Sequence, residues 1–220
     1  MHYLDYNEKK QHGTTEFPLE YYYIDENHSR YRMPFHWHRE MEFVHIIRGR
    51  LHLYLDDREY LASDGDLIHI AGGVIHGGEP ENCVYECIVF DPAPLLMNTQ
   101  DARSYFRKIE LRQVLVHEHF TSENDPLVLS YAGQLYSSAH EKAPGWELST
   151  MGALFSIYGT IFHQTRYEPA TSNYVDHGKH RHSHWRHSNH RRNRTQPGKN
   201  HTGKTCTCLR HVSQVLLPIL

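Results

Sequence analysis

The chain has 220 residues, of which 39% are hydrophobic and 22% are charged. This length and composition suit one domain with a packed core and a short appendage. No apolar run approaches the roughly 18 residues of a membrane span, and the N-terminus is polar and lacks the apolar core of a signal peptide. We therefore expect a cytoplasmic protein with no membrane partner.

The net charge of −3 conceals two halves of opposite sign. Residues 1–169 contain 14 Lys and Arg against 25 Asp and Glu, whereas residues 170–220 contain 9 basic residues and one acid, Asp176. Nucleic-acid binding rests on neutralising phosphates, so we do not expect the acidic part to bind DNA by itself. The basic tail could contact DNA, but only nonspecifically.

The four cysteines fall into two pairs, Cys83 with Cys87 and Cys206 with Cys208. Neither spacing is the C-x2-C of common zinc sites, and nothing indicates a disulfide framework. We expect Cys83 and Cys87 to be small buried hydrophobic residues.

Residues 1–91 are expected to form an arm and then a series of short strands. The arm, residues 1–32, contains the aromatic patch 21–23, which predicts a first edge strand. From Met33 to Asp91, apolar and polar residues alternate, with Cys83 to Phe90 as the last clear strand. Turns are predicted at Gly49, Asp56-Asp57, Asp64-Gly65, Gly72-Gly73 and Gly77-Gly78. Such strands and turns are typical of a small β-sandwich or barrel.

Imidazole and carboxylate side chains alternate after the arm, at His36, His38, Glu40 and Glu42. Alternate residues of a strand point to one face, so we expect all four on one face of one strand. Three imidazoles and a carboxylate converge if His76 faces them from another strand. These donors suit Zn, Ni, Fe, Mn or Cu. The alternatives are a ligand pocket without metal and a set of side chains that satisfy one another.

The same residues resemble the two sequence motifs of cupins. His36, His38, Glu42 and Gly49 match the first motif, which is His-x-His, three residues, Glu, six residues and Gly. The resemblance implies a mainly β fold, a cupin-type (double-stranded β-helix or jelly-roll) barrel.

The second cupin motif is Gly, five residues, Pro-x-Gly, two residues, His, three residues and Asn. Gly65, Gly73 and His76 match it, whereas Ala71 replaces the proline and Pro80 replaces the asparagine. These departures affect the shape of the turn and leave the set of metal ligands intact.

The sequence around His36 and His38, from Pro34 through Val44, is most similar to the sensor half of AraC-type transcriptional regulators, over residues 33–167. The resemblance implies a small-molecule effector, such as a carbohydrate, and a homodimer. It also implies an arm that folds over the ligand, so that tyrosines of the arm would line the pocket. The expected ligand-binding residues are His36, His38, Glu40, Glu42, His76 and Tyr23, and the expected metal ligands are His36, His38, Glu42 and His76.

Two helices are predicted after a connector, residues 95–122, that has no clear pattern. The first begins near Pro126 and ends near Glu141, with a buried face at Val128, Ala132, Leu135 and Ala139. The second has an apolar face at Met151, Leu154, Phe155, Tyr158, Ile161, Phe162 and Thr165. The pair either packs on its own barrel or forms a dimer interface. The resulting domains are the arm at 1–32, the barrel and connector at 33–122, a helical dimerisation segment at 123–167 and an irregular tail at 168–220.

The tail has no hydrophobic periodicity and holds eight of the 21 histidines, so it cannot form a core. An AraC-type regulator would carry two helix-turn-helix motifs here. Residues 211–220, with suitable codons read one nucleotide out of frame, give a string similar to the start of a recognition helix. We hypothesise that a frameshift near residues 170–176 replaced the DNA-binding domain, in which case the metal-binding appearance of the tail histidines is accidental.

Two classes of function follow. The first is an effector-sensing, dimerising domain of a bacterial transcription regulator that is not an enzyme. The second is a stand-alone metal-dependent cupin enzyme, a dioxygenase or an isomerase. The helical pair after the barrel favours the first, because a lone enzyme does not need it.

Overall fold

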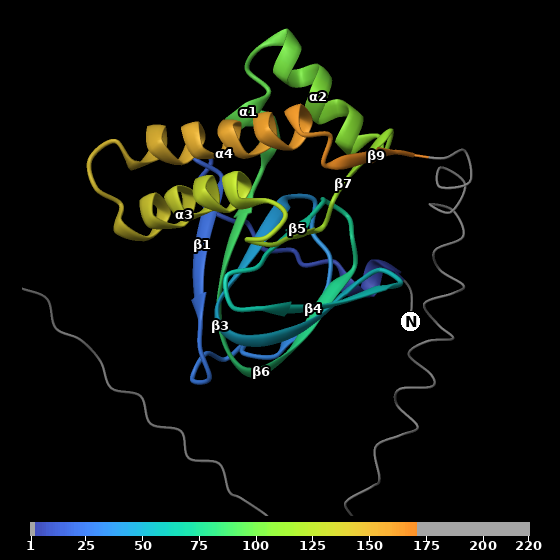
Figure 1. Cartoon of the computed structure of the whole chain (residues 1–220), viewed down its shortest axis with the longest axis vertical. Helices are drawn as coiled ribbons and strands as arrows, with labels where there is room; N and C mark the ends of the chain where they lie inside the picture. The colour runs from blue at the N-terminus through green and yellow to red at the C-terminus, as the bar shows by residue number, and fades with distance from the viewer. Residues whose placement is uncertain (1–2, 171–220) are drawn as a thin grey trace, which may run out of the picture.

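A computed structural model describes residues 3–170; residues 1–2 and 171–220, and with them all predictions about the basic tail, lie outside the described part. The described part has an antiparallel sheet of seven strands, covered by helices along one side (Figure 1). Its strands are β1 Leu19–Ile24, β2 Met33–His36, β3 Met41–Leu55, β4 Arg58–Ser63, β5 Leu67–Ile70, β6 His76–Phe90 and β8 His119–Phe120. The short strands β7 Val114–Val116 and β9 Tyr167–Pro169 pair separately. The predicted mainly β, cupin-type fold is confirmed.

Two long strands organise the sheet. β3 and β6, each of 15 residues, pair antiparallel from Met41 opposite Phe90 to Leu55 opposite His76. β3 also pairs with β4 and β5, and β6 also pairs with β1 and β2. The predicted first edge strand is confirmed, since β1 lies at one end of the sheet. The strands curl around a common interior (Figure 1).

Two of the predicted turns are wrong because the strands continue through them. Gly49 lies inside β3, where φ is +83° and the pairing with β6 shifts in register. A Cβ there would lie 2.1 Å from the carbonyl oxygen of Asn82, so this glycine permits a bulge with close contact between backbones. Gly77 and Gly78 lie inside β6. The turns at residues 56–57, 64–65 and 72–73 are confirmed.

Two helices that the sequence pattern did not predict follow β6, the first starting just before the connector and the second inside it. They are α1 Pro92–Leu96 and α2 Gln100–Glu110, and each begins at a side-chain cap. Asp91 accepts a hydrogen bond from the backbone N–H of Ala93, and Thr99 accepts one from that of Ala102. Both helices add buried side chains to the core.

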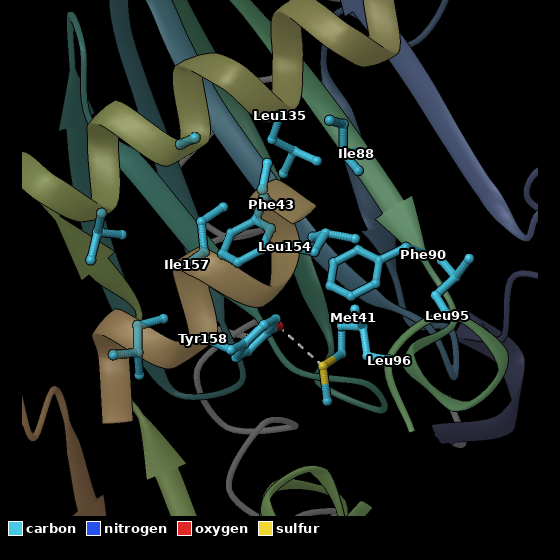
Figure 2. Close-up of a cluster of buried hydrophobic side chains, with 14 of the residues drawn as sticks. Met41, Phe43, Ile88, Phe90, Leu95, Leu96, Leu135, Leu154, Ile157 and Tyr158 are labelled. Carbon is cyan, nitrogen blue, oxygen red and sulfur yellow. Dashed lines mark hydrogen bonds between the residues drawn. The ribbon is translucent and has the colours of Figure 1, made fainter. Parts of the chain in front are cut away.

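The predicted helical pair is confirmed as α3 Pro126–Glu141 and α4 Trp146–His163. Figure 2 shows Leu135 of α3 and Leu154 and Ile157 of α4 around Phe43 of β3. Phe90 of β6 belongs to the same cluster. The predicted face of α3 is buried at Val128, Ala132, Leu135 and Ala139. No helix of residues 3–170 is long and apolar enough to cross a membrane.

The predicted face of α4 is partly wrong. Leu154, Tyr158 and Ile161 are buried, but Phe155 is 36% exposed, and the helix ends before Thr165. Ala153 and Ile157 are buried in addition, so the contact stripe runs at spacings of three and four through these residues. Phe155 lies beside that stripe and faces outward.

His69 makes the core sensitive to acid. Its ring is 1% exposed, Nε2 lies 3.1 Å from the hydroxyl of Tyr158, and that hydroxyl contacts Met41 Sδ at 3.3 Å (Figure 2). Burial, together with the charge of Arg112, lowers the pKa of His69 to about 3. The unfolded chain therefore binds a proton below pH 6.5 that the folded chain does not, and stability falls with acidification.

We expect His69→Gln to flatten that dependence. Between about pH 6 and pH 4, the loss of unfolding free energy per pH unit should shrink by up to about 1.4 kcal/mol relative to the wild type. Urea denaturation at a series of pH values measures both slopes. Parallel profiles would contradict the assignment of the acid sensitivity to His69.

Candidate metal centre

Four side chains from separate elements meet at one end of the barrel. His36 is the last residue of β2, and His76, the first residue of β6, is its partner in the sheet register. Glu42 lies near the start of β3, and His38 lies in the segment between β2 and β3. The prediction of one continuous strand from His36 to Glu42 is therefore wrong. The chain turns between the two strands, and the four side chains still converge.

The donor atoms of this group are close enough to share one ion. One nitrogen or oxygen from each of His36, His38, Glu42 and His76 lies within 4.8 Å of the others. Glu42 Oε2 is 3.1 Å from His38 Nε2 and 3.2 Å from His76 Nε2. Glu42, His38 and His76 are buried, and His36 is partly exposed. Three imidazoles and one carboxylate suit a divalent transition metal.

The backbone fixes the orientation of all three imidazoles. Nδ1 of His36 lies 2.8 Å from the carbonyl of Pro34, Nδ1 of His38 lies 3.1 Å from that of Glu40, and Nδ1 of His76 lies 2.9 Å from that of Val74. A carbonyl only accepts, so each Nδ1 carries a proton and donates it. Each Nε2 therefore faces the ligand group. Metal-binding histidines show the same arrangement, in which the other ring nitrogen donates a hydrogen bond to the protein.

The electrostatics of the group also favour a cation. Burial alone would raise the pKa of the Glu42 carboxyl, but hydrogen bonds and charge from His38 and His76 hold this pKa well below its usual range. Burial and the neighbouring His76 lower the pKa of His36 to about 4, so this ring is neutral near pH 7. A buried carboxylate beside several imidazole nitrogens suits a metal ion.

Two predicted ligand-binding residues lie apart from this group. Glu40 approaches His38 from the other side of the ring, with its carboxylate 3.7 Å from Nδ1. Tyr23 is 49% exposed and lines a separate depression with Asp25 and Asn82. Its neighbour Tyr22 faces the candidate centre instead, because adjacent residues of β1 point to opposite faces.

A cavity of about 360 Å³ opens onto the group. Burial, followed by the charge of Glu42, raises the pKa of the Cys87 thiol in its wall well above the usual value. Cys83 and Cys87 are both buried and free, which confirms that prediction. The lining residues are Glu8, Lys10, His12, Tyr22, Ile24, His28, Ser29, Arg30, Met33, Pro34, His36, His38, Glu42, Tyr85, Cys87 and Val89.

The N-terminal arm forms part of the cavity wall and is fastened to the segment that carries His36 and His38. Trp37 N–H donates to the carbonyl of Tyr6, and Glu8 N–H donates to the carbonyl of Trp37, both at 2.9 Å. The ring of Tyr3 stacks on that of Trp37 with centroids 4.5 Å apart. Sequence reasoning found the arm but not which of its residues face the cavity.

Glu8 connects the arm to the candidate centre. One carboxylate oxygen lies 3.4 Å from His36 Nε2, and the other accepts a hydrogen bond from Arg30 at 2.6 Å. His12, four residues further along the arm, is also buried. No sequence pattern predicted the position of either residue.

A curled β barrel with a buried histidine and glutamate group, a cavity and a helical cover defines a cupin-type domain with room for a small ligand. Residues 18–157 match the AraC-like ligand binding domain. The chain belongs to this family.

A relative from Bacillus subtilis (strain 168), named as the uncharacterized HTH-type transcriptional regulator YdeC, is 31% identical over 96 residues. The match covers 40% of this chain and 33% of the relative, so this chain spans about a third of that protein. Similar solved structures include an RmlC-like cupin from Shewanella frigidimarina NCIMB 400, at 20% identity and a TM-score of 0.29 over 34% of this chain and 66% of that one. Oxalate decarboxylase from Bacillus subtilis is 22% identical with a TM-score of 0.25 over 28% of this chain and 18% of that one.

Proposed function

We propose that this chain is the effector-sensing part of a bacterial transcription regulator and that it binds its ligand without turning it over. Membership of the AraC-like ligand binding family supports the sensing role, as does the similarity to an HTH-type transcriptional regulator of Bacillus subtilis. The cavity of about 360 Å³ has the size of a small-molecule site. The effector is a small hydroxylated molecule, such as a carbohydrate or a derivative of one.

We further propose that His36, His38, Glu42 and His76 hold one divalent transition metal ion. The observation that carries this proposal is the pairing of all three Nδ1 atoms with backbone carbonyls, which leaves the three Nε2 atoms to face the ligand group. A bound ion would supply Lewis-acid binding of a ligand oxygen. The residues of the cavity wall orient the rest of the ligand and exclude water from it.

Thermal unfolding of the full chain tests both parts of this function. The protein is loaded with Zn²⁺ or Ni²⁺, and a panel of sugars, sugar acids and polyols is added to loaded and metal-free samples. Ligands that bind the folded state should raise Tm, and more so for the loaded samples. NMR of the same mixtures should find each ligand intact after incubation. Consumption of a stabilising ligand would favour the metal-dependent dioxygenase or isomerase instead.

We also propose that the chain forms a homodimer through the outer face of α4. Leu148, Gly152, Phe155 and Gly159 follow one another at spacings of four, three and four, which places them on one stripe. Leu148 is 76% exposed and Phe155 36%, and a Cβ on either glycine would have nothing within 4 Å. Glycine inside an exposed helix costs about 1 kcal/mol relative to alanine, so a close helix–helix contact would account for it.

We expect Phe155→Glu to convert the dimer into a monomer while leaving the barrel folded. A charge placed in an apolar dimer interface costs several kcal/mol when it has no partner. Light scattering after size exclusion gives the mass, and circular dichroism reports the fold. Leu111→Glu is the matched control, because Leu111 is 63% exposed on a different surface, at the end of α2. Equal masses for both variants would refute the α4 interface.

For the DNA-binding half we propose that a frameshift near residues 170–176 replaced the helix-turn-helix motifs, so that the sequence from there to residue 220 reflects a shifted reading frame. Its support is the composition of the tail, which has nine basic residues, one acid and no hydrophobic periodicity after residue 169. The coding DNA decides the question. A shifted frame that encodes no helix-turn-helix would refute the proposed frameshift.

A further inference from the structure

Three polar side chains form a cluster in the wall of the cavity, beside the candidate metal ligands. Lys10 Nζ donates to the hydroxyl of Tyr22 at 2.7 Å, and the same hydroxyl lies 2.8 Å from His12 Nδ1. The ring of His12 is 5.4 Å, between centroids, from that of His38. Lys10 and His12 come from the part of the arm that precedes β1, and Tyr22 comes from β1, so folding of the first residues of the arm onto the barrel assembles the cluster.

One atom of this cluster has no hydrogen-bond partner within the described residues. His12 is 4% exposed, yet its Nε2 makes no hydrogen bond, and the carboxylate of Glu8 is 3.8 Å away. Buried polar atoms are normally paired, so an orphan in a cavity wall points to a ligand atom that completes it.

The hydrogen bonds determine what kind of ligand atom fits. Tyr22 accepts from Lys10, so its own proton is available for Nδ1 of His12. Burial raises the pKa of Tyr22 far above its usual value, and the phenol keeps this proton. With Nδ1 accepting, the proton of the neutral His12 ring is on Nε2. The free positions of the cluster are therefore N–H donors, on His12 and on the ammonium of Lys10.

Charge leads to the same conclusion. Within the described residues, no carboxylate lies within 4.0 Å of Lys10 Nζ, whereas Arg30 is paired with Glu8. With a divalent ion beside Glu42, the side chains that line the cavity would leave two positive charges in excess, because Glu8 offsets Arg30, Lys10 adds one charge and the ion exceeds Glu42 by one. A group that only accepts hydrogen bonds and carries negative charge satisfies both conditions, and a carboxylate is such a group.

We propose that the effector of this domain is a small hydroxylated carboxylic acid, such as a sugar acid, whose carboxylate is bound by Lys10 and His12, while Tyr22 holds both side chains in position. The inference rests on the proposed metal-dependent sensing site and specifies its ligand class. Lys10 is exposed to solvent at the cavity wall, so its ammonium gains a counter-charge from such an acid and none from a neutral sugar. The arm therefore selects ligands by charge as well as covering the cavity.

Matched pairs of acids and neutral analogues test this inference. The full chain, loaded with Zn²⁺, is titrated calorimetrically with glucuronate against glucose, lactate against propane-1,2-diol, and malate against butane-1,2,4-triol. We expect at least one acid to bind ten-fold or more tightly than its neutral partner. Lys10→Met and Tyr22→Phe should each weaken that acid at least ten-fold. Lys9→Met, which removes an exposed neighbouring charge outside the cavity lining, should leave its affinity unchanged.

Metal analysis separates failure of this inference from failure of the metal site. Wild type, Lys10→Met and Tyr22→Phe should all retain one equivalent of Zn²⁺, because neither substituted residue belongs to the ligand group. If the ion is bound but no acid binds better than its neutral partner, or Lys10→Met binds the acid as well as Lys9→Met does, the carboxylate site is refuted. A wild type that takes up no ion refutes the metal proposal instead.

Discussion

His76→Ala is expected to abolish stoichiometric metal binding. The wild-type protein, incubated with Zn²⁺ or Ni²⁺ and then desalted, should retain about one equivalent by elemental analysis. The variant should lose affinity by more than about 100-fold, because even residues that only orient a ligand contribute about 10–100-fold. His76 is 1% exposed, its Nε2 lies 3.2 Å from Glu42, and no other imidazole in the described chain occupies its position in the group.

The control for this substitution is His52→Ala. His52 lies on β3 like Glu42, but its side chain is 40% exposed and lies near Glu81, away from the ligand group. This variant should retain the full equivalent of metal. It also accounts for adventitious binding by the histidines of the tail, which both variants keep. Full retention of metal by His76→Ala would show that the ion binds elsewhere in the chain.

Gly72→Ala is expected to destabilise the protein and weaken metal binding, although residue 72 is not a ligand. A Cβ at this position would lie 2.1 Å from the backbone carbonyl oxygen of Arg39. Beside it, Gly73 N–H donates to the carbonyl of His38 at 2.7 Å. Any shift that relieves the overlap therefore moves the segment that carries His38. Overpacking of this kind costs about 1–3 kcal/mol.

Urea denaturation of the metal-free protein and a metal titration measure the two effects separately. Gly133→Ala is the control, because Gly133 is in α3 and a Cβ there has nothing within 4 Å. This variant should be unchanged or more stable by up to about 1 kcal/mol, since alanine favours helix over glycine. Identical urea midpoints for Gly72→Ala and the wild type would contradict this prediction, because they would mean that the loops carrying Gly72 and Arg39 move apart without loss of stability.

The ligand group could be predicted from sequence because three of its four residues, His36, Glu42 and His76, lie on strands. Alternation with period two identified His36, His38 and Glu42, and a second glycine-rich segment identified His76. The same alternation does not reveal where a strand ends. It therefore could not distinguish one strand from the two that meet between His36 and Glu42.

Glycine was the main source of error in the fold. Gly49 was predicted to form a turn, because glycine with positive φ occurs both in turns and in β-bulges. Only its contact with Asn82 of β6 identifies the bulge. The sequence also did not predict which side chains of the arm face the cavity. Glu8, Lys10 and His12 lie in a polar segment without regular structure, so tertiary contacts rather than local pattern decide which side chains face the cavity.

The four proposed ligands are anchored with very different rigidity, which bears on how quickly an ion would exchange. Glu42 is paired on both sides, opposite Ile70 of β5 and Val89 of β6. His38 lies in a short loop that is fastened to the arm through Trp37. Short peripheral contacts open more often than the centre of a sheet. We expect an ion to leave by detachment of the arm and this loop, so the arm sets its residence time.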